Sequence, residues 1–461
     1  EGEIIVRVLI TGITSFLGLY TAKLLLQEGH EVIGAVRPGS RRAQELDAHG
    51  ISAYPTYRTV HLDLSALPEA ELGEAHYAEV LGLDGAADPA RSAESAGHSG
   101  TAATMQVAAA SAHSSEPAGH SGTAAAIQAV AAPAHSSEPA GHSGAAPAAT
   151  APQKATRLPS SALADDAAPL IDAWIHFAWD GVGSAGRSDT NIQIENIQNA
   201  KKAYLYAKLL GARKFLFAGS QAEYGVGNHR VPMPVSPYGK AKLSFGRWAT
   251  EQSLLSEIYD DAPMQFIHMR IYSVYGSGDH ETSLVNTVLR AALRHEAITL
   301  GPCEQRWNYL EVHDLARAIR ILLRSEDTRT GIYDIAGSDS RQLKKYVIAM
   351  NAIAARFAAN ADTAADGGAT TAATVHAAIA GDQTTGTVAS ATHAATADGQ
   401  TTGTAAGAAP AGAELRFGTR ANNAEGAANM SPEILKLQRL GFHQEISFEA
   451  GIGMLLKTMK V

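Results

Sequence analysis

One N-terminal segment constrains the fold more than any other part of the chain. Residues 6–10 (VRVLI) form an apolar run that predicts a buried strand, and residues 11–18 (TGITSFLG) follow as a glycine-containing turn. An apolar-periodic helix then continues to the neighbourhood of Gly29. A buried strand that passes through a glycine turn into a helix is typical of the first unit of a parallel α/β sheet.

The turn itself predicts a dinucleotide site. Gly12 allows the chain to turn tightly, and the backbone N–H groups that open a helix can bind a pyrophosphate. We therefore predict cofactor contacts from the turn and from the residues at the helix start: Gly12, Ser15, Phe16, Leu17 and Gly18. The alternative is a strand-to-helix turn with a purely structural role.

The ends of the next two strands bear on which cofactor binds. Residues 31–37 (EVIGAVR) end at Arg37 with two further arginines close behind, and no acidic residue follows to accept hydrogen bonds from a ribose 2′-hydroxyl. A guanidinium suits a 2′-phosphate, so the pattern favours NADP over NAD, unless these arginines form only a solvated basic loop. Residues 57–64 carry Asp63 at their end, as a partner for the adenine amine or as an ordinary loop carboxylate.

Two segments lack the composition of a folded domain. Residues 84–165 are rich in Ala, Ser, Gly, Pro and His and repeat with a period of 22, which aligns His98, His120 and His142. Residues 360–411 repeat with a period of 17. Neither segment has enough large apolar side chains to offset the entropy of ordering, so both are predicted to be disordered inserts. No cysteine or carboxylate cluster accompanies the repeated histidines, and we expect no metal site.

Outside the inserts, strands and helices alternate. Residues 172–179 (DAWIHFAW) predict a fourth strand, residues 189–210 a helix, and residues 214–220 (KFLFAGS) a further strand. The expected fold is α/β: a Rossmann-type doubly wound parallel sheet with a smaller C-terminal substrate domain and two low-complexity disordered inserts. In chain order the segments are the first Rossmann part at 1–83, the first insert at 84–165, the second Rossmann part at 166–276, substrate-domain segments with a return to the core at 277–359, the second insert at 360–411 and the last substrate-domain part at 412–461.

Parallel sheets of this kind bind ligands beyond the carboxyl ends of their strands. Gly12, Asp63, Phe177 and Ser220 all fall at such ends, so we expect them to share one crevice. Phe177 and its neighbour Ala178 therefore join the predicted cofactor contacts.

Residues 236–242 (SPYGKAK) open a helix that carries a candidate acid–base pair. Tyr238 and Lys242 are four residues apart and lie on one helix face. A phenol is a poor acid–base group at neutral pH unless a neighbouring ammonium stabilises its anion and lowers its pKa. Lys242 can do this, and Ser220 can hydrogen-bond the substrate oxygen that the phenol protonates. The same spacing also occurs on solvated helices that have no catalytic role.

Charge and cysteine content narrow the functional class. The net charge is −9 with a pI near 6.1, and no basic stripe is present, which argues against nucleic acid and anionic membranes as partners. The one cysteine, Cys303, excludes an internal disulfide and fits a reducing compartment. No apolar run approaches the length of a membrane span, and the chain opens on an acidic residue and a strand rather than on a signal peptide, so we expect a cytoplasmic protein.

Taken together, the motifs resemble the extended short-chain dehydrogenase/reductases, and among these the NAD-dependent sugar-nucleotide epimerases, dehydratases and ketoreductases. The resemblance covers nearly everything outside the two inserts. It rests on TGITSFLG at 11–18, Asp63, HFAW at 176–179, Asn196, Ser220 with the following AEYG, YGKAK at 238–242, RIYSVYG at 270–276 and GPCEQRWNYLEVHDLARAI at 301–319.

The resemblance implies a division of labour at the active site. Tyr238 exchanges a proton with the sugar oxygen while hydride passes to or from the nicotinamide, and Lys242 holds the nicotinamide ribose and lowers the pKa of the phenol. Ser220 orients the substrate oxygen. Asn196 belongs to the supporting hydrogen-bond network or, alternatively, is a helix-surface amide.

The resemblance also implies the contacts of a nucleotide-sugar substrate, predicted at Ser273, Arg306 and Trp307. Trp307 stands where many relatives place a diphosphate-binding arginine, with Arg306 one residue earlier. Because side chains alternate along a strand, Arg306 binds the diphosphate or points away from it, and Trp307 stacks on a base or simply packs. A homodimer through the helices that bear Asn196 and Tyr238 is expected on the same basis.

The residues after Ser220 narrow the reaction. The 4,6-dehydratases of the family carry an Asp-Glu pair directly after the active-site hydroxyl, whereas this chain has Gln221 and Ala222, neither of which shuttles a proton. This argues against a dehydratase. The resemblance and the basic end of the second strand together favour reduction of a 4-keto nucleotide sugar with NADP, similar to the CDP-abequose synthase type. The alternatives are a C4 epimerase that retains NAD, and a non-catalytic NADP-binding sensor or scaffold on the same fold.

Overall fold

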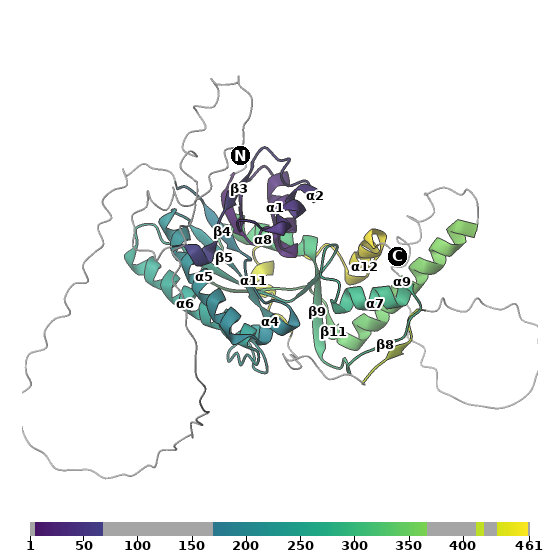
Figure 1. Cartoon of the computed structure of the whole chain (residues 1–461). Coiled ribbons are helices and arrows are strands. Elements are labelled where there is room, and N and C mark those ends of the chain that lie inside the picture. Colours follow the sequence, from purple (N-terminus) through teal and green to yellow (C-terminus); the bar gives the residue numbers. More distant parts are fainter. Residues whose placement is uncertain (1–4, 68–168, 367–411, 419–430, 460–461) are drawn as a thin grey trace, which may run out of the picture. The chain divides into compact units, whose positions relative to one another are not determined.

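The computed structural model describes residues 5–67, 169–366, 412–418 and 431–459 (Figure 1). All of them belong to one compact unit, which spans residues 1–87 and 169–461. The predicted insert at 84–165 and its repeated histidines lie outside the described residues. The same is true of the predicted insert at 360–411 beyond residue 366.

A seven-stranded sheet with strand order β10-β6-β5-β4-β1-β2-β3 forms the centre of the molecule. All neighbouring strands are parallel, which confirms the predicted doubly wound sheet. The strand order reverses between β1 and β4, and ligands bind at this kind of switch point. The strands are β1 Arg7–Thr11, β2 Glu31–Val36, β3 Tyr57–His61, β4 Ala173–His176, β5 Lys214–Ser220, β6 Gln265–Ile271 and β10 Gly331–Ile335.

Helices cover both faces of this sheet. Side chains alternate between the two faces along each strand, and apolar side chains on both faces need a covering layer. In β1, Val8 and Ile10 belong to the core on one face, and Leu9 belongs to the core on the other. Parallel strands buried on both faces read as continuous apolar runs, which explains VRVLI and KFLFAGS. The first core includes α1 (Phe16–Gln27), the short α2 (Gln44–Ala48) and α8 (Val312–Arg324), and the second includes α5 (Thr190–Leu209) and α6 (Pro237–Tyr259).

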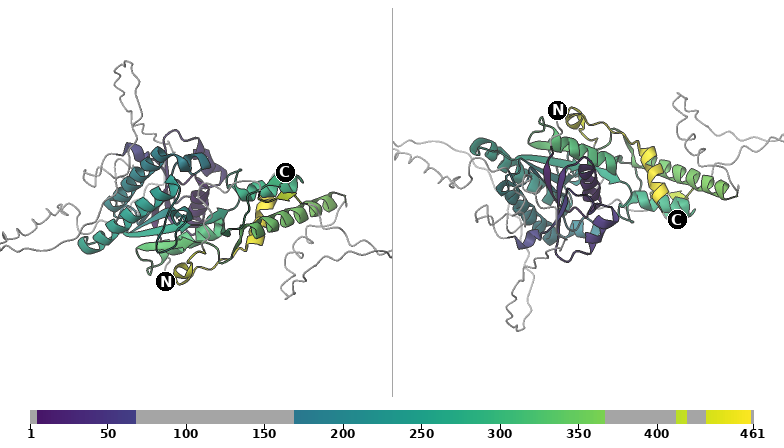
Figure 2. Two further views of the ribbon diagram at one scale, coloured as in Figure 1. Left: turned by 90° about the horizontal axis from the view of Figure 1, so that it is seen from below. Right: turned by 90° about the horizontal axis from the view of Figure 1, so that it is seen from above.

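A smaller lobe has its own apolar core. Three helices supply most of it: α7 (Leu284–Leu293), α9 (Leu343–Asp366) and α12 (Phe448–Thr458). A three-stranded sheet of β7 (Ser273–Tyr275), β9 (Arg306–Glu311) and β11 (Ser340–Gln342) adjoins them, and β8 (Ile298–Thr299) pairs with β12 (Leu415–Arg416). Helix α9 lies alongside α12 (Figure 2).

One boundary differs from the expected one, the start of the predicted second insert at residue 360, for a local reason. Helix α9 continues to Asp366, past residue 360, because the alanine-rich sequence that follows Phe357 has high helix propensity. Near the C-terminus, residues 431–433 lie outside the single turn α11 (Leu435–Gln438). The backbone N–H of Glu433 instead donates to the buried carboxylate of Asp334 at 2.8 Å.

Candidate active site

The glycine turn between β1 and α1 is closely packed against the end of β4. Gly12 has φ +74°, and a Cβ atom there would lie 2.6 Å from the backbone N of Ala178. A Cβ atom on Gly18 would lie 2.4 Å from the carbonyl oxygen of Gly12. Both glycines are therefore required by the backbone itself, and together they bring the start of α1 to the switch point of the sheet.

Ser15 begins α1 as its N-cap. Its φ of −76° and ψ of 160° are extended values that a serine adopts without strain, and its Oγ accepts a hydrogen bond from the N–H of Gly18 at 3.1 Å. The backbone contacts that exclude a side chain in this turn are thus made at Gly12 and Gly18 and not at Ser15. The N–H groups of Phe16 and Leu17, in the first turn of the helix, have no carbonyl partner within the helix and suit a pyrophosphate.

Arg37, at the carboxyl end of β2, is engaged by an acidic residue that sequence reasoning missed. Its guanidinium donates two hydrogen bonds to the carboxylate of Asp180, at 3.0 and 3.1 Å. Asp180 directly follows the HFAW segment at the end of β4. That position, beyond the carboxyl end of a strand, is the one feature of the sequence that could have indicated a role at the site. The arginine at the carboxyl end of β2 is therefore paired with the aspartate in the loop that follows β4.

Asn196 holds the backbone of this acidic residue in place. The side chain of Asn196, on α5, is buried; its Oδ1 accepts from the N–H of Asp180 and its Nδ2 donates to the carbonyl of Asp180, both at 2.9 Å. One turn earlier, Gln193 accepts a hydrogen bond from Trp179 Nε1 at 2.8 Å. Helix α5 thus fixes the loop that carries Phe177 and Ala178 to the glycine turn.

Asp63 is half-buried and caps the short 3₁₀ turn at Leu64–Ala66. Its Oδ1 accepts hydrogen bonds from the backbone N–H of Ser65 at 3.0 Å and from the Ser65 hydroxyl at 2.6 Å. This local role matches the alternative of a loop carboxylate, and the adenine contact stays a prediction.

Ser220 ends β5 and is held by the turn that follows it. Its N–H donates to Glu223 Oε1 at 2.8 Å, and its Oγ accepts from the N–H of Ala222 at 3.2 Å. Glu223 is fully buried and also accepts hydrogen bonds from His268 Nε2 and Arg270 Nε, both at 3.0 Å. Burial opposes ionisation of Glu223, but His268, Arg270 and the Ser220 N–H outweigh it and lower its pKa.

Two glycines make room for the imidazole of His268 in this network. A Cβ atom on Gly219 would lie 2.5 Å from His268 Nε2, and one on Gly246 would lie 2.2 Å from His268 Cε1. Strand β5 and helix α6 therefore approach the ring from two sides. Glu223 was not among the predicted site residues, although it lies within the AEYG motif.

The first turn of α6 packs against the turn after Ser220. Ser236 caps the helix by accepting from the N–H of Gly239 at 3.1 Å. A Cβ atom on Gly239 would lie 2.4 Å from the carbonyl oxygen of Ala222, so only glycine permits this approach. The contact places Tyr238, which is 6% exposed, next to the segment that carries Ser220.

Lys242 is buried beside Tyr238 and reaches β5. Its ammonium donates to the carbonyl oxygen of Ala218 at 2.5 Å, lies 4.0 Å from the ring centroid of Trp179, and lies 5.5 Å from that of Tyr238. Burial lowers its pKa to about 7; the charge of Glu223 opposes the shift and that of Arg187 adds to it. A lysine that titrates near neutral pH is typical of functional sites.

A cation that the sequence did not indicate lies over the phenol. The guanidinium carbon of Arg187, on the short helix α4 (Ser184–Ser188), lies 4.6 Å from the ring centroid of Tyr238. Its Nε donates to the carbonyl of Val182 at 2.7 Å, which fixes the side chain to its own loop. The aromatic ring of Tyr238 thus has positive groups from two different helices nearby.

The predicted substrate residues lie on two neighbouring strands, β7 and β9, of the three-stranded sheet. Ser273, at the start of β7, accepts a hydrogen bond from Gln221 Nε2 at 3.2 Å and so lies beside the turn after Ser220. Arg306 is exposed on β9, and its Nη2 donates to the carbonyl of Ser340 at 2.8 Å. Trp307, one residue along, packs on the core of the smaller lobe, which matches the packing alternative for this residue.

Comparison with known proteins identifies the family of the chain. Residues 8–147 and 155–336 match the model of the NAD dependent epimerase/dehydratase family. The chain is 26% identical over 163 residues to the CDP-abequose synthase of Yersinia pseudotuberculosis, a match that covers 35% of this chain and 54% of that protein. It therefore spans about half the length of this curated relative.

Solved structures share the fold at low sequence identity. The UDP-glucose 4-epimerase of Thermotoga maritima, solved with UDP-glucose, superposes with a TM-score of 0.54 at 13% identity, covering 98% of this chain and 97% of that one. The UDP-glucuronic acid 4-epimerase of Bacillus cereus, solved with UDP-glucuronic acid and NAD, gives 0.52 at 12% identity and covers 98% of both chains.

Proposed function

The chain belongs to the NAD-dependent epimerase/dehydratase family, and from this premise we propose that it transfers hydride between a nicotinamide cofactor and a nucleotide sugar. The observation that carries the proposal is the packing of α6 against the turn after Ser220, which places buried Tyr238 and Lys242 at the carboxyl end of β5. The names of the relatives support the substrate class, since a CDP-abequose synthase and two UDP-sugar epimerases are among them.

The glycine turn fits the pyrophosphate of the cofactor. Gly12 and Gly18 leave no room for a side chain, and the first turn of α1 offers its N–H groups at the same place. When bound, the cofactor supplies the hydride acceptor or donor. The residues of the chain orient the sugar and move a proton.

Tyr238 is the proposed proton donor and acceptor at the sugar oxygen, and Ser220 is the proposed hydrogen-bond donor to the same oxygen. The Lys242 ammonium favours the phenolate electrostatically. Because burial brings the pKa of Lys242 to about 7, its charge changes within the working pH range, and the phenolate is best supported below that value.

Reduction with NADP is the proposed direction. Gln221 and Ala222 provide no acid or base for dehydration, and Arg37 is the cation at the end of β2 that suits a 2′-phosphate. One observation favours the second candidate, a C4 epimerase that retains NAD: Asp180 already holds the guanidinium of Arg37 with two hydrogen bonds. The two candidates differ in whether the cofactor is consumed or kept.

The test is the identity of the copurifying cofactor together with turnover. Protein that purifies without cofactor and oxidises NADPH only when a 4-keto nucleotide sugar is added would support the reductase. Tightly bound NAD with interconversion of two nucleotide sugars would support the epimerase instead.

Replacement of the phenol separates catalysis from binding. Tyr238→Phe is expected to lower kcat by about 10²- to 10⁴-fold while cofactor affinity stays within about twofold, because the variant removes only the proton-transfer group. Unchanged turnover in Tyr238→Phe would refute the proposed role. A wild-type protein that binds NADPH but reduces no keto nucleotide sugar would instead support a cofactor-binding sensor.

A further inference from the structure

One pocket is lined by His268 and Arg270, the two residues whose side chains donate hydrogen bonds to Glu223. It has a volume of about 300 Å³ and lies among α6, β6, β10 and the loop that precedes α6. Five of its lining residues are cationic or titratable bases: His229, Arg230, Arg247, His268 and Arg270. Among the described residues no acidic side chain lines it; the nearest carboxylates to His229 are those of Asp334 at 3.6 Å and Glu433 at 3.9 Å.

Its floor is built from buried groups. His268 is 1% exposed and Arg270 is 2% exposed, and both are bonded to Glu223. The Arg270 guanidinium also lies over the ring of Tyr224, with its carbon 4.4 Å from the ring centroid. A buried floor whose side chains are held in fixed positions is the kind of surface that selects a ligand by shape and charge.

The rim of the pocket carries uncompensated charge. Arg230 and Arg247 are exposed, and among the described residues neither guanidinium has a hydrogen-bond or ion-pair partner. His229 is already bonded to the Tyr224 hydroxyl and to the carbonyl of Ser431, both at 3.0 Å. The two arginines are therefore the groups left to bind an anion.

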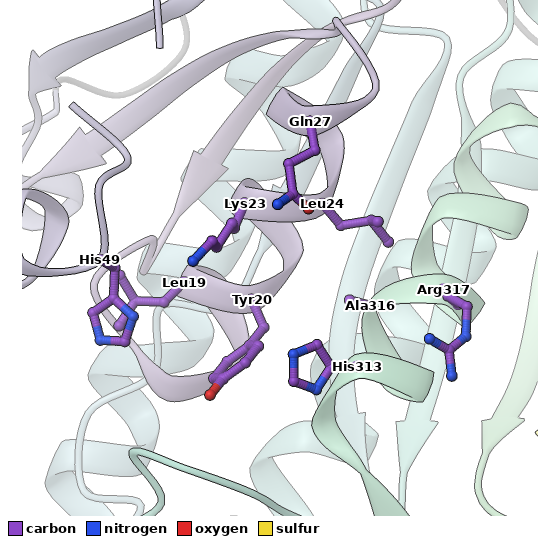
Figure 3. A pocket seen from close by; sticks show the side chains of 9 residues that line it. All are labelled: Leu19, Tyr20, Lys23, Leu24, Gln27, His49, His313, Ala316 and Arg317. Atoms are coloured by element: carbon purple, nitrogen blue, oxygen red, sulfur yellow. The ribbon is translucent and has the colours of Figure 1, made fainter. Parts of the chain in front are cut away.

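A larger pocket between α1 and α8 provides a contrast (Figure 3). It has a volume of about 360 Å³ and also contains cations, but most of them have acidic partners. Arg317 is paired with Asp314 and Glu445, and His313 lies 3.0 Å from Glu311. Lys23 and Arg317 lie at opposite ends of this pocket, so they do not converge on one ligand.

We propose that the pocket on α6 binds a small ligand with a phosphate group. Guanidinium groups bind phosphate through paired hydrogen bonds, and Arg230 and Arg247 are free to do so above the fixed floor. A volume of about 300 Å³ is at the lower end for small-molecule sites, which suits inorganic phosphate or a phosphorylated sugar. Through Glu223, the floor of this pocket is bonded to the backbone of Ser220.

The test is calorimetric titration of the full chain with inorganic phosphate and, separately, with a hexose 1-phosphate. Ionic strength is held constant, and NAD is present at saturation so that the glycine turn is occupied. Saturable binding of either ligand at one site is expected, and tighter binding of the hexose 1-phosphate would identify the phosphate ester as the ligand. The Arg230→Gln/Arg247→Gln double variant should bind at least about tenfold more weakly, since each charge-assisted hydrogen bond is worth that much.

A matched control removes two arginines from the smaller lobe, Arg290→Gln/Arg294→Gln on and just after α7. This variant should bind both ligands as the wild type does. Absence of saturable binding, equal binding by the Arg230/Arg247 variant, or an equal loss in the control would each overturn the proposal. Circular dichroism of both double variants would verify that their folds are intact.

Discussion

Asp180 is the residue most able to shift cofactor preference, because its carboxylate competes with a 2′-phosphate for Arg37. Asp180→Asn should raise NADPH affinity several-fold and leave NADH affinity nearly unchanged, since the exposed ion pair is weak but the competing charge is lost. The hydrogen bonds between Asn196 and residue 180 involve the backbone of residue 180 and not its side chain, so the loop should keep its position in the variant. Fluorescence titration with both cofactors measures the change.

Arg37→Gln is the matched control for that experiment. It should weaken NADPH binding and leave NADH binding nearly unchanged. If Asp180→Asn and the wild type bound NADPH equally, the competition would not exist.

His176 is expected to make the protein sensitive to acid. Complete burial, with a smaller contribution from the charge of Lys242, lowers its pKa to about 3. The unfolded chain therefore binds a proton near pH 6.5 that the folded chain does not bind until about pH 3. Stability is lost as pH falls through 6.5, by about 2 kcal/mol between pH 8 and pH 5 from this group.

His176→Phe should remove this part of the pH dependence. The variant loses the 2.8 Å hydrogen bond between the ring and Thr11 Oγ1, so it should be about 1 kcal/mol less stable at pH 8. By pH 5 it should equal or exceed the wild type. Denaturant unfolding at both pH values tests this, and parallel losses in the two proteins would contradict it.

Within the helices, the distance from a glycine to the neighbouring backbone, rather than helix propensity, decides whether that glycine can be replaced. Gly18→Ala should destabilise the protein strongly and abolish cofactor binding, because the new methyl group would meet the Gly12 carbonyl at 2.4 Å. Gly453→Ala, in α12, meets nothing within 4 Å and should stabilise the fold by about 0.5–1 kcal/mol. Thermal unfolding of both variants measures the contrast, and equal shifts would show that packing at Gly18 is not the cause.

The last turns of α6 expose an apolar face to solvent. Leu254, Leu255, Ile258 and Tyr259 are 42–78% exposed there. We expect a second copy of the chain to cover this face, as burying such side chains is favourable. Ile258→Glu should convert a dimer into a monomer in light scattering coupled to size exclusion.

Ile348→Glu is the control for this prediction, since Ile348 is an exposed apolar residue of α9 in the other lobe. A wild-type protein that is monomeric at the concentrations used, or a dimer in which Ile258→Glu has no effect, would contradict the prediction. None of the helices in the described part of the chain has both the length and the apolarity of a membrane span.

Local chemistry explains why many elements could be predicted from the sequence. Gly29 and Gly211 end their helices with positive φ, as a glycine after an apolar-periodic segment predicts. Ser236 and Pro237 begin α6 where SPYG predicts a cap and a first turn. Each of these signals is complete within a few neighbouring residues, so one chain segment is enough to specify it.

Backbone sterics and periodicity are enough to specify the alternation of strands and helices, the glycine turn and the helix face shared by Tyr238 and Lys242. The pairing of Asp180 with Arg37 and the bond between Glu223 and His268 beside Ser220 instead arise from the folded chain. Such pairs depend on which strands become neighbours and in what register. That choice is made by the packing of the whole core, and no local pattern encodes it.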